Sequence, residues 1–211
     1  MANSAARTSA LYDVHPSVAM VQKWIAELKP KTGRSLEEWI GLVKTSGPKE
    51  SHARRAWLGS KYNLGSNSAR WIAERAEGKG EEEDNPEKYL AAAVKYVREQ
   101  YAGKKAALRP LYDQLLSLGK SLGPDVRACP CKTMVPLYRE HVFAQIKPTT
   151  NSRIDLGLSL ASYKGKLPKL LIDTGGLAKK DRITHRIEVI SSKQIDGELK
   201  KWLEAAYHLG G

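Results

Sequence analysis

The sequence predicts an α+β protein, in which an N-terminal helical bundle of helix-turn-helix type precedes a domain built as helix, antiparallel sheet and helix. A change of period along the chain supports this class. Apolar residues recur with the helical period of 3.6 through the first half, and with the strand period of 2 after Asp125. Before that change, the acidic segment 77–84 contains no apolar residue, as expected of a linker. We therefore predict a helical domain at 1–84, with the acidic linker at its end, and an α+β domain at 85–211.

The first two helices of the bundle are predicted from an apolar stripe and from a capping pattern. The stripe runs from Val18 to Leu28 at i, i+3 and i+4 spacing, and the loop 29–34 should end that helix. Ser35 and Glu38 have the spacing of a capping box, in which each side chain satisfies a free backbone N–H. The apolar residues expected to be buried by this second helix are Trp39, Ile40, Leu42 and Val43.

The next two helices are joined by a short turn and have the outline of a helix-turn-helix unit. Pro48 fits the first turn of one helix, 63–65 is the turn, and Ser66 can cap the helix that follows. Ordinary packing or a protein contact is the alternative interpretation, because this outline is common in helical bundles. The predicted contacts to a nucleic-acid backbone are Lys49, Arg54, Arg55, Lys61, Ser66, Asn67 and Arg70.

The second domain is predicted to begin with a helix at Asn85 and Pro86, followed by another helix from about Pro110 to Gly123. Four runs then alternate between apolar and polar residues, as strands with one buried face do, so an antiparallel sheet is expected. The runs are 132–138, 142–147, 153–160 and 184–191, and the chain should end in a helix at 195–209.

The net charge of +12 indicates a polyanionic partner, with nucleic acid as the first choice. Residues 1–79 carry a net charge of +6, residues 80–104 carry −2 and residues 105–211 carry +8. The two surpluses therefore suggest two separate contact surfaces. A surplus that only keeps the protein soluble is the alternative.

A second candidate site lies on the polar face of the predicted sheet. Arg153 and Asp155 are two residues apart and should share that face, opposite the apolar residues of the same strand. A cluster of basic groups around one carboxylate would suit phosphate or another small anion. An ion pair that merely fixes the sheet is the alternative. The predicted members are Lys132, Lys147, Arg153, Asp155, His185 and Arg186.

No catalytic motif, nucleotide fingerprint or metal-ligand cluster is found in the sequence, so we predict no catalytic residue, no cofactor and no metal. Cys129 and Cys131 flank Pro130, and positions this close rarely allow an unstrained disulfide. Two thiolates also leave a tetrahedral zinc site incomplete, so reduced thiols are expected. No apolar run is long enough to cross a membrane, and residues 1–10 do not form a secretory signal. We therefore expect a disordered tail at residues 1–10 and a cytoplasmic location.

Several motifs resemble a bacterial family of paired domains of unknown function. Residues 32–39 are similar to the T-G-K-S-x-E-E-W motif of its small helical domain, and the resemblance continues through 56–58 and 62–65. The C-terminal domain resembles a type that carries a "predicted transport protein" label and occurs beside restriction-type nucleases. That resemblance rests on 108–112, 123–126, 132–133, 143–144, 148–158, 184–186 and 202–207.

Transport finds no support, because the sequence contains no membrane span, and the 129–131 motif departs from the family pattern. The leading hypothesis is a non-enzymatic protein that associates with nucleic acid through the helices of its first domain. An adaptor or small-anion-binding module that uses the polar face of the sheet is the second hypothesis. An uncharacterised enzyme is the third.

Overall fold

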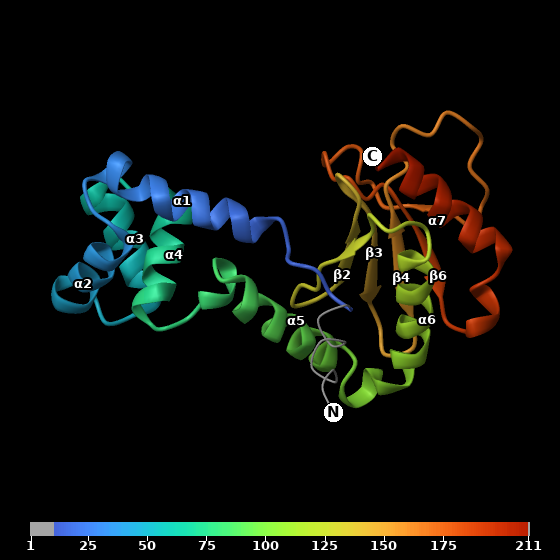
Figure 1. Cartoon of the computed structure of the whole chain (residues 1–211), viewed down its shortest axis with the longest axis horizontal. Helices are drawn as coiled ribbons and strands as arrows, with labels where there is room; N and C mark the ends of the chain where they lie inside the picture. Colours follow the sequence, from blue (N-terminus) through green and yellow to red (C-terminus); the bar gives the residue numbers. More distant parts are fainter. Residues whose placement is uncertain (1–10, 211) are drawn as a thin grey trace, which may run out of the picture. The chain divides into compact units, whose positions relative to one another are not determined.

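The computed structural model describes residues 11–210, which form two compact units (Figure 1). A helical unit covers Val14–Leu90, and an α+β unit contains Ala91–Gly211 together with the segment that ends at Asp13. The α+β class predicted from the sequence is confirmed. The tail predicted at residues 1–10 lies outside the described residues.

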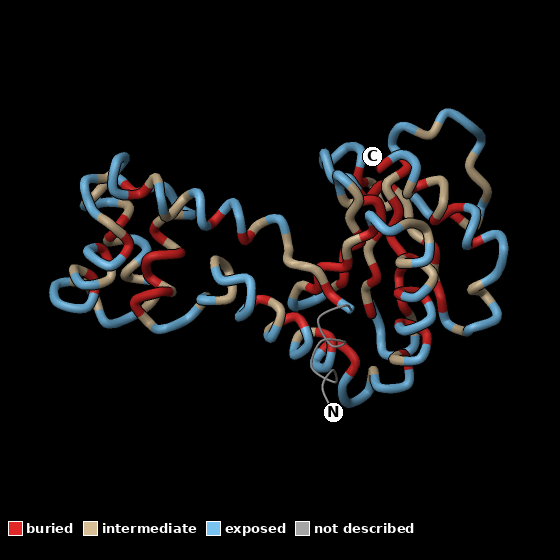
Figure 2. Tube along the Cα trace, viewed as in Figure 1, coloured by how far each residue is buried: buried red, intermediate tan, exposed pale blue. Residues whose placement is uncertain are grey.

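The helical unit is built around an apolar core between its helices, and Figure 2 shows buried residues along most of α4. Trp39 stacks edge-on against Tyr62, with 5.1 Å between the ring centroids, and Tyr62 makes a similar contact with Trp57. Ile40 and Leu42 are only partly buried, so the burial predicted for α2 holds for Trp39 and Val43. The elements are α1 (Ser17–Thr32), α2 (Leu36–Ser46), α3 (Ser51–Tyr62), α4 (Ser66–Ala76), η2 (Glu81–Glu83) and the first residues of α5 (Pro86–Gln100).

The end of α1 differs from the prediction, whereas the start of α2 agrees with it. Helix α1 continues through Pro30 to Thr32, although proline has no N–H with which to bond the preceding turn. Gly33 then adopts a left-handed conformation, with φ of 79°, and its N–H donates to the Lys29 carbonyl. The capping box is present: the Ser35 N–H donates to Glu38 Oε2 at 2.6 Å, and the Glu38 N–H donates to Ser35 Oγ at 3.3 Å.

The helices α3 and α4 begin at other residues than the sequence suggested. Helix α3 begins at Ser51 and not in the turn after Pro48, whose carbonyl accepts a hydrogen bond from Arg54 Nε. Gly65, rather than Ser66, occupies the N-cap position of α4, and no side chain caps this helix. The turn between the helices is as predicted, with Asn63 in the left-handed region at φ of 52°.

The acidic segment 77–84 is packed against α4 through ion pairs. The buried Arg75 guanidinium pairs with Asp84 at 2.5 Å and also donates to the Lys79 carbonyl. Gly80 passes so close that a Cβ at this position would lie 2.3 Å from Arg75 Nη1, and its φ of 78° also favours glycine. This segment is therefore an ordered part of the helical unit rather than a loose connection.

The α+β unit contains a six-stranded sheet in the order β1-β2-β3-β4-β6-β5, in which all neighbouring strands are antiparallel, as predicted. Helices α6 and α7 pack against β3. The last helix begins at Gly197, after its N-cap Asp196, and not at Ile195. The elements are η3 (Gly103–Leu108), α6 (Arg109–Lys120), β1 (Arg127–Ala128), β2 (Val135–Tyr138), β3 (Val142–Pro148), β4 (Ile154–Leu158), β5 (Ile172–Asp173), β6 (His185–Val189), η4 (Ser192–Gln194) and α7 (Gly197–Leu209).

The register of the sheet separates an apolar face from a polar face. Residues directly opposite each other in an antiparallel pair point to the same face. The apolar face carries Leu137, Ala144, Ile146, Leu156, Leu158, Ile187 and Val189, all of them buried. The polar face carries Gln145, Lys147, Asp155, Arg186 and Glu188. Gly119 of α6 lies so close to Leu137 that a Cβ at this position would be 2.4 Å from its Cδ1.

Within residues 11–210, no helix is long and apolar enough to span a bilayer.

Candidate functional site

Four of the predicted nucleic-acid contacts meet at one hollow of the helical unit. This hollow, of about 530 Å³, lies between α3 and α4. Arg55, Ser66, Asn67 and Arg70 line it. The structure therefore brings together residues that are fifteen positions apart in the sequence, as the helix-turn-helix outline implied.

The arginines at this hollow are, however, paired with carboxylates of the same unit. Arg55 and Arg70 lie 2.9 Å and 2.7 Å from the two carboxylate oxygens of Glu74. Arg54, on the adjoining part of α3, pairs with Glu77 at 3.3 Å. Because each guanidinium already has an anionic partner, these side chains offer a nucleic acid little free positive charge.

The two lysines among the predicted contacts lie elsewhere on α3 and before it. The Lys61 ammonium stands over the rings of Trp57 and Tyr62, 5.6 Å and 5.7 Å from their centroids. Lys49 makes no ion pair with any residue that the structure describes. Neither lysine lines the hollow between α3 and α4.

The charge surplus of the chain belongs to the α+β unit. Residues 14–90 contain 13 Lys and Arg against 11 Asp and Glu, a net charge of +2. Residues 91–211 contain 21 against 11, a net charge of +10. The positive surplus is thus shared by both ends of the sequence, but it is not shared equally by the two folded units.

On the polar face of the sheet, Arg153 and Asp155 do share a site, as predicted. Arg153 Nε lies 2.9 Å from Asp155 Oδ1, and Arg153 Nη1 lies 2.8 Å from a carboxylate oxygen of Glu188. Arg186 approaches the same two carboxylates at 3.5 Å and 2.9 Å. The Thr149 hydroxyl donates to Asp155 Oδ2 at 2.8 Å. Two guanidiniums and two carboxylates thus form a closed network across β4 and β6.

This network has the character of a structural ion-pair cluster. Its formal charges cancel, and Asp155 is only 8% exposed. Arg153 Nε, Asp155 Oδ1 and Arg186 Nε are buried without a well-aligned hydrogen bond, although the first two atoms are within ion-pair distance. Opposite charges at this distance attract even when the hydrogen bond between them is bent. The network therefore fixes the register of two strands and leaves little net charge for an anion.

The other residues predicted for this site are placed apart from the network. His185 precedes Arg186 in β6, so the two side chains point to opposite faces, and His185 Nδ1 lies 3.0 Å from the Thr184 hydroxyl. Lys132 and Lys147 instead line a hollow of about 400 Å³ beside the network, together with Lys105. Of the six predicted residues, the structure therefore joins three in the network and two in the hollow.

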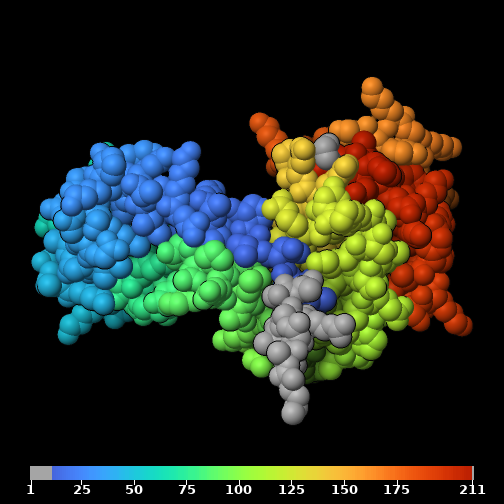
Figure 3. All heavy atoms as spheres, in the orientation of Figure 1, coloured from blue at the N-terminus to red at the C-terminus, as the bar shows by residue number. Residues whose placement is uncertain are grey.

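A basic surface that the sequence reasoning missed lies in the connection between β4 and β6. Residues 161–184 carry six basic side chains against two acidic ones, and all six are exposed. None of them forms an ion pair with any residue that the structure describes. Figure 3 shows parts of this connection, in orange, protruding from the surface of the unit. The six are Lys164, Lys166, Lys169, Lys179, Lys180 and Arg182.

The two acidic residues of this connection are used in its turns. Asp173 Oδ1 accepts the Gly175 N–H at 2.7 Å, and Asp181 Oδ1 accepts the Ile183 N–H at 3.1 Å. The signal in the sequence was the density of lysine between two strands. It was overlooked because these basic residues do not follow one another in a run.

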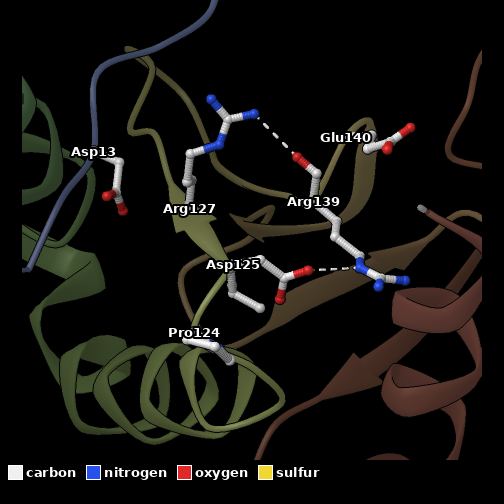
Figure 4. Close-up of a pocket in the computed structure, with 7 residues that line it drawn as sticks. Asp13, Pro124, Asp125, Arg127, Arg139 and Glu140 are labelled. Atoms are coloured by element: carbon white, nitrogen blue, oxygen red, sulfur yellow. Dashed lines mark hydrogen bonds and ion pairs between the residues drawn. The ribbon is translucent and has the colours of Figure 1, made fainter.

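A further hollow, of about 530 Å³, lies around Asp125 (Figure 4). Arg139 Nε donates to Asp125 Oδ2 at 2.7 Å, and the Tyr207 hydroxyl donates to Asp125 Oδ1 at 2.7 Å. The hydrogen bonds from Arg139 and Tyr207 lower the pKa of the Asp125 carboxyl, and the bond to Asp125 raises the pKa of the Tyr207 hydroxyl. Gly123 makes this contact possible, since a Cβ there would lie 2.3 Å from the Tyr207 oxygen. The hollow is lined by both charge signs, so it does not select an anion.

The two cysteines are thiols that are not joined in a disulfide. Burial raises the pKa of Cys129 to about 12 and also raises the pKa of Cys131. Both therefore stay protonated at neutral pH, where a thiol is a poor nucleophile and a poor metal ligand. Across residues 11–210, no three His, Cys, Asp or Glu side chains are grouped so that they could hold a metal ion.

Comparison with known families finds two matches. A family model described as a domain of unknown function, DUF5655, matches residues 97–210, which is more than half of the chain. A second model, also described as a domain of unknown function, DUF4287, matches residues 20–78. No curated protein and no solved structure shows significant similarity to the chain. The paired-domain architecture that the motifs suggested is therefore present, and neither description carries a function.

Proposed function

The chain belongs to the DUF5655 family, and we propose that it is a non-enzymatic nucleic-acid-binding protein whose main phosphate contacts come from the α+β unit. The observation that carries this proposal is the connection 161–184, with six exposed basic side chains that have no carboxylate partner among the described residues. Free ammonium and guanidinium groups release counterions from a nucleic acid when they replace them at phosphates, and this release drives binding.

The proposal assigns the helical unit a lesser part in binding. Three arginines of α3 and α4 are paired with Glu74 and Glu77. Such pairs must open before a phosphate can be contacted, so the gain in free energy is offset by the loss of the internal partner. Among the basic members of the set predicted from the sequence, Lys49 and Lys61 remain available for contact.

A cytoplasmic location is part of the same proposal. The chain has two cysteines, neither of them in a disulfide, and structural disulfides are the usual feature of small proteins in oxidising compartments. A bacterial source is also consistent with the paired-domain motifs.

The test is a titration of a fluorescently labelled duplex of about 20 base pairs, followed by anisotropy at about 50 mM and about 200 mM salt. We expect a Kd in the micromolar range at the lower salt, and a loss of roughly tenfold or more at the higher salt. A loop variant should bind more weakly, and its salt dependence should be shallower by about 0.9 for each phosphate contact that is lost. This loop variant carries Lys166→Ala, Lys169→Ala, Lys179→Ala and Arg182→Ala.

A matched control removes the same number of charges from other exposed positions. It carries Lys23→Ala, Lys31→Ala, Lys44→Ala and Lys200→Ala. If the connection makes the phosphate contacts, the control should keep more affinity than the loop variant. Equal losses in the two variants would show a diffuse charge effect, and no binding of the unaltered protein at the lower salt would refute the proposal.

A further inference from the structure

The hollow beside the arginine–carboxylate network is lined by cations from three parts of the α+β unit. Lys105 comes from η3, Lys132 from the segment before β2, and Lys147 from β3. Its volume of about 400 Å³ lies within the range of small-molecule sites. The only acidic residue that lines it is Glu99, whose side chain is 57% exposed and lies 3.8 Å from Lys95. The hollow therefore has a local excess of positive charge.

The positions of two of these lysines are set by the fold. Lys105 Nζ donates one hydrogen bond to the Pro148 carbonyl at 2.6 Å, which leaves two of its protons for a ligand. Lys147 lies directly opposite Asp155 across β3 and β4. It forms no ion pair with that carboxylate, because Arg153, Arg186 and Thr149 already surround it. The Lys147 ammonium is thus left to the hollow.

A buried acceptor among the residues lining the hollow narrows the identity of the ligand. Gln100 is 8% exposed, and its Nε2 donates to the Cys131 carbonyl at 2.7 Å. That bond fixes the orientation of the amide, since the reverse orientation would place two oxygens against each other. Gln100 Oε1 is then buried with no hydrogen-bond partner among the described residues. An unsatisfied acceptor of this kind is stabilised by a ligand that donates a proton to it.

From these observations we propose that the hollow binds a hydrogen phosphate ion, or a phosphate monoester that retains one P–OH. The phosphate oxygens accept from the lysine ammonium groups, and the P–OH donates to Gln100 Oε1. Sulfate has the same charge and shape as hydrogen phosphate but carries no proton at neutral pH. A phosphodiester carries none either, so the site separates hydrogen phosphate, and the protonated monoanion of a phosphate monoester, from the backbone of a nucleic acid.

The experiment is isothermal titration calorimetry of the full chain with sodium phosphate, sodium sulfate and dimethyl phosphate, at equal ionic strength and neutral pH. We expect phosphate to bind with a Kd of roughly 0.1–1 mM, and the other two to bind at least about tenfold more weakly, as expected when one hydrogen bond to a buried acceptor is missing. Equal binding of sulfate and phosphate would overturn the assignment. So would the lack of saturable binding up to about 20 mM phosphate.

Two variants with a matched control locate the site. Lys132 is exposed, so Lys132→Ala should not disturb folding, and it should weaken phosphate binding roughly fivefold to tenfold. Lys104 is an exposed neighbour of Lys105 that does not line the hollow, so Lys104→Ala should change the Kd by less than about twofold. Gln100→Met should abolish the preference for phosphate over sulfate. Equal effects of the two lysine variants would refute the location.

This inference is independent of the proposed nucleic-acid binding, and the two can fail separately. The loop variant described above leaves every residue of the hollow in place. It should therefore bind phosphate like the unaltered protein even if its affinity for duplex DNA is reduced. A parallel loss of both activities would show that the phosphate site lies in the connection 161–184 and not in the hollow.

Discussion

The two units contain the same number of acidic residues but differ in how far their basic residues are paired with carboxylates. Residues 14–90 and residues 91–211 each hold 11 Asp and Glu, against 13 and 21 Lys and Arg. In the helical unit, the arginines of α3 and α4 all pair with carboxylates between Glu74 and Asp84. In the α+β unit, the arginine pairs are concentrated on the sheet, and the basic side chains of the connection 161–184 have no carboxylate partner within residues 11–210. A count of basic residues therefore does not locate the positive surface, because the pairing of each residue decides its contribution.

The largest expected effect comes from removing a carboxylate of the network on the sheet. It tests whether this network contributes more to stability than the ion pairs of α3 and α4. Asp155→Ala removes a nearly buried carboxylate that faces two guanidiniums and accepts from Thr149. We expect the free energy of unfolding of the α+β unit to fall by about 2–3 kcal/mol, because partly buried charges lose their partner. Urea titration of the full chain, followed by NMR signals of that unit, measures the change.

Glu74→Ala is the corresponding change in the helical unit. The Glu74 side chain is more exposed than that of Asp155 and pairs with arginines that also reach solvent. We expect a loss of about 1 kcal/mol or less, as is usual for pairs near the surface. Equal losses of unfolding free energy in Asp155→Ala and Glu74→Ala would mean that the network on the sheet stabilises the protein no more than ion pairs near the surface.

The fold was predictable from periodicity and capping, while the helix ends depended on local packing. The alternation at 153–160 correctly placed Arg153 and Asp155 on one face, because side chains in a strand alternate strictly. The end of α1 was missed because the helix continues through Pro30, which has no N–H for the helical hydrogen bonds, and ends only where Gly33 adopts the left-handed conformation. The sequence pattern at Pro48 allowed a helix start, but the chain turns once more before α3 begins.

The candidate sites were less predictable, because they depend on contacts between distant residues. The contact between Glu74 and Arg55 follows from no local pattern, whereas the i, i+4 spacing of Arg70 and Glu74 could have been read from the sequence as a helical ion pair. The joint assignment of His185 and Arg186 to one face conflicts with the alternation of a strand, and that part of the site could have been corrected from the sequence. The role of Gln100 depends on its distance from Cys131, which only the folded chain defines.

Glu74 should also be the reason why Arg55 and Arg70 are weak phosphate contacts. This expectation rests on the proposed nucleic-acid binding. Glu74→Gln keeps the size of the side chain but removes the negative charge between Arg55 and Arg70. We expect the affinity for duplex DNA at about 50 mM salt to rise roughly twofold to fivefold, since the freed guanidiniums can contact phosphates. Anisotropy titration measures this, and an unchanged Kd would mean that these arginines are already engaged or stay out of reach.

A control for this substitution comes from another carboxylate of the same unit. Glu27 pairs with Lys31 on α1, away from the hollow between α3 and α4. Glu27→Gln removes the same charge, so it should reproduce only the general electrostatic part of the effect. If both substitutions raise the affinity equally, pairing with Glu74 has no particular influence on binding.

The smallest expected effect concerns His15, a titratable group at the start of the helical unit. Its Nδ1 accepts the Ser17 N–H at 3.0 Å, which a protonated imidazole cannot do. Burial lowers the pKa of His15 below its ordinary value of about 6.5. The unfolded chain therefore binds a proton more readily than the folded one, so the stabilisation is complete above about pH 6.5 and is lost as the pH falls through the folded pKa.

Urea titrations at about pH 7.5 and about pH 5.5, followed by tryptophan fluorescence, should thus show a small decrease in stability at the lower pH. His15→Asn should flatten this dependence, because an amide oxygen accepts the Ser17 N–H at both values. His52 is exposed on α3, so His52→Asn should leave the dependence as it is in the unaltered chain. If His15→Asn keeps the full pH dependence, the loss of stability at the lower pH arises from other groups. The two units would then differ in the pairing of their arginines, but not through a buried neutral histidine in the helical unit.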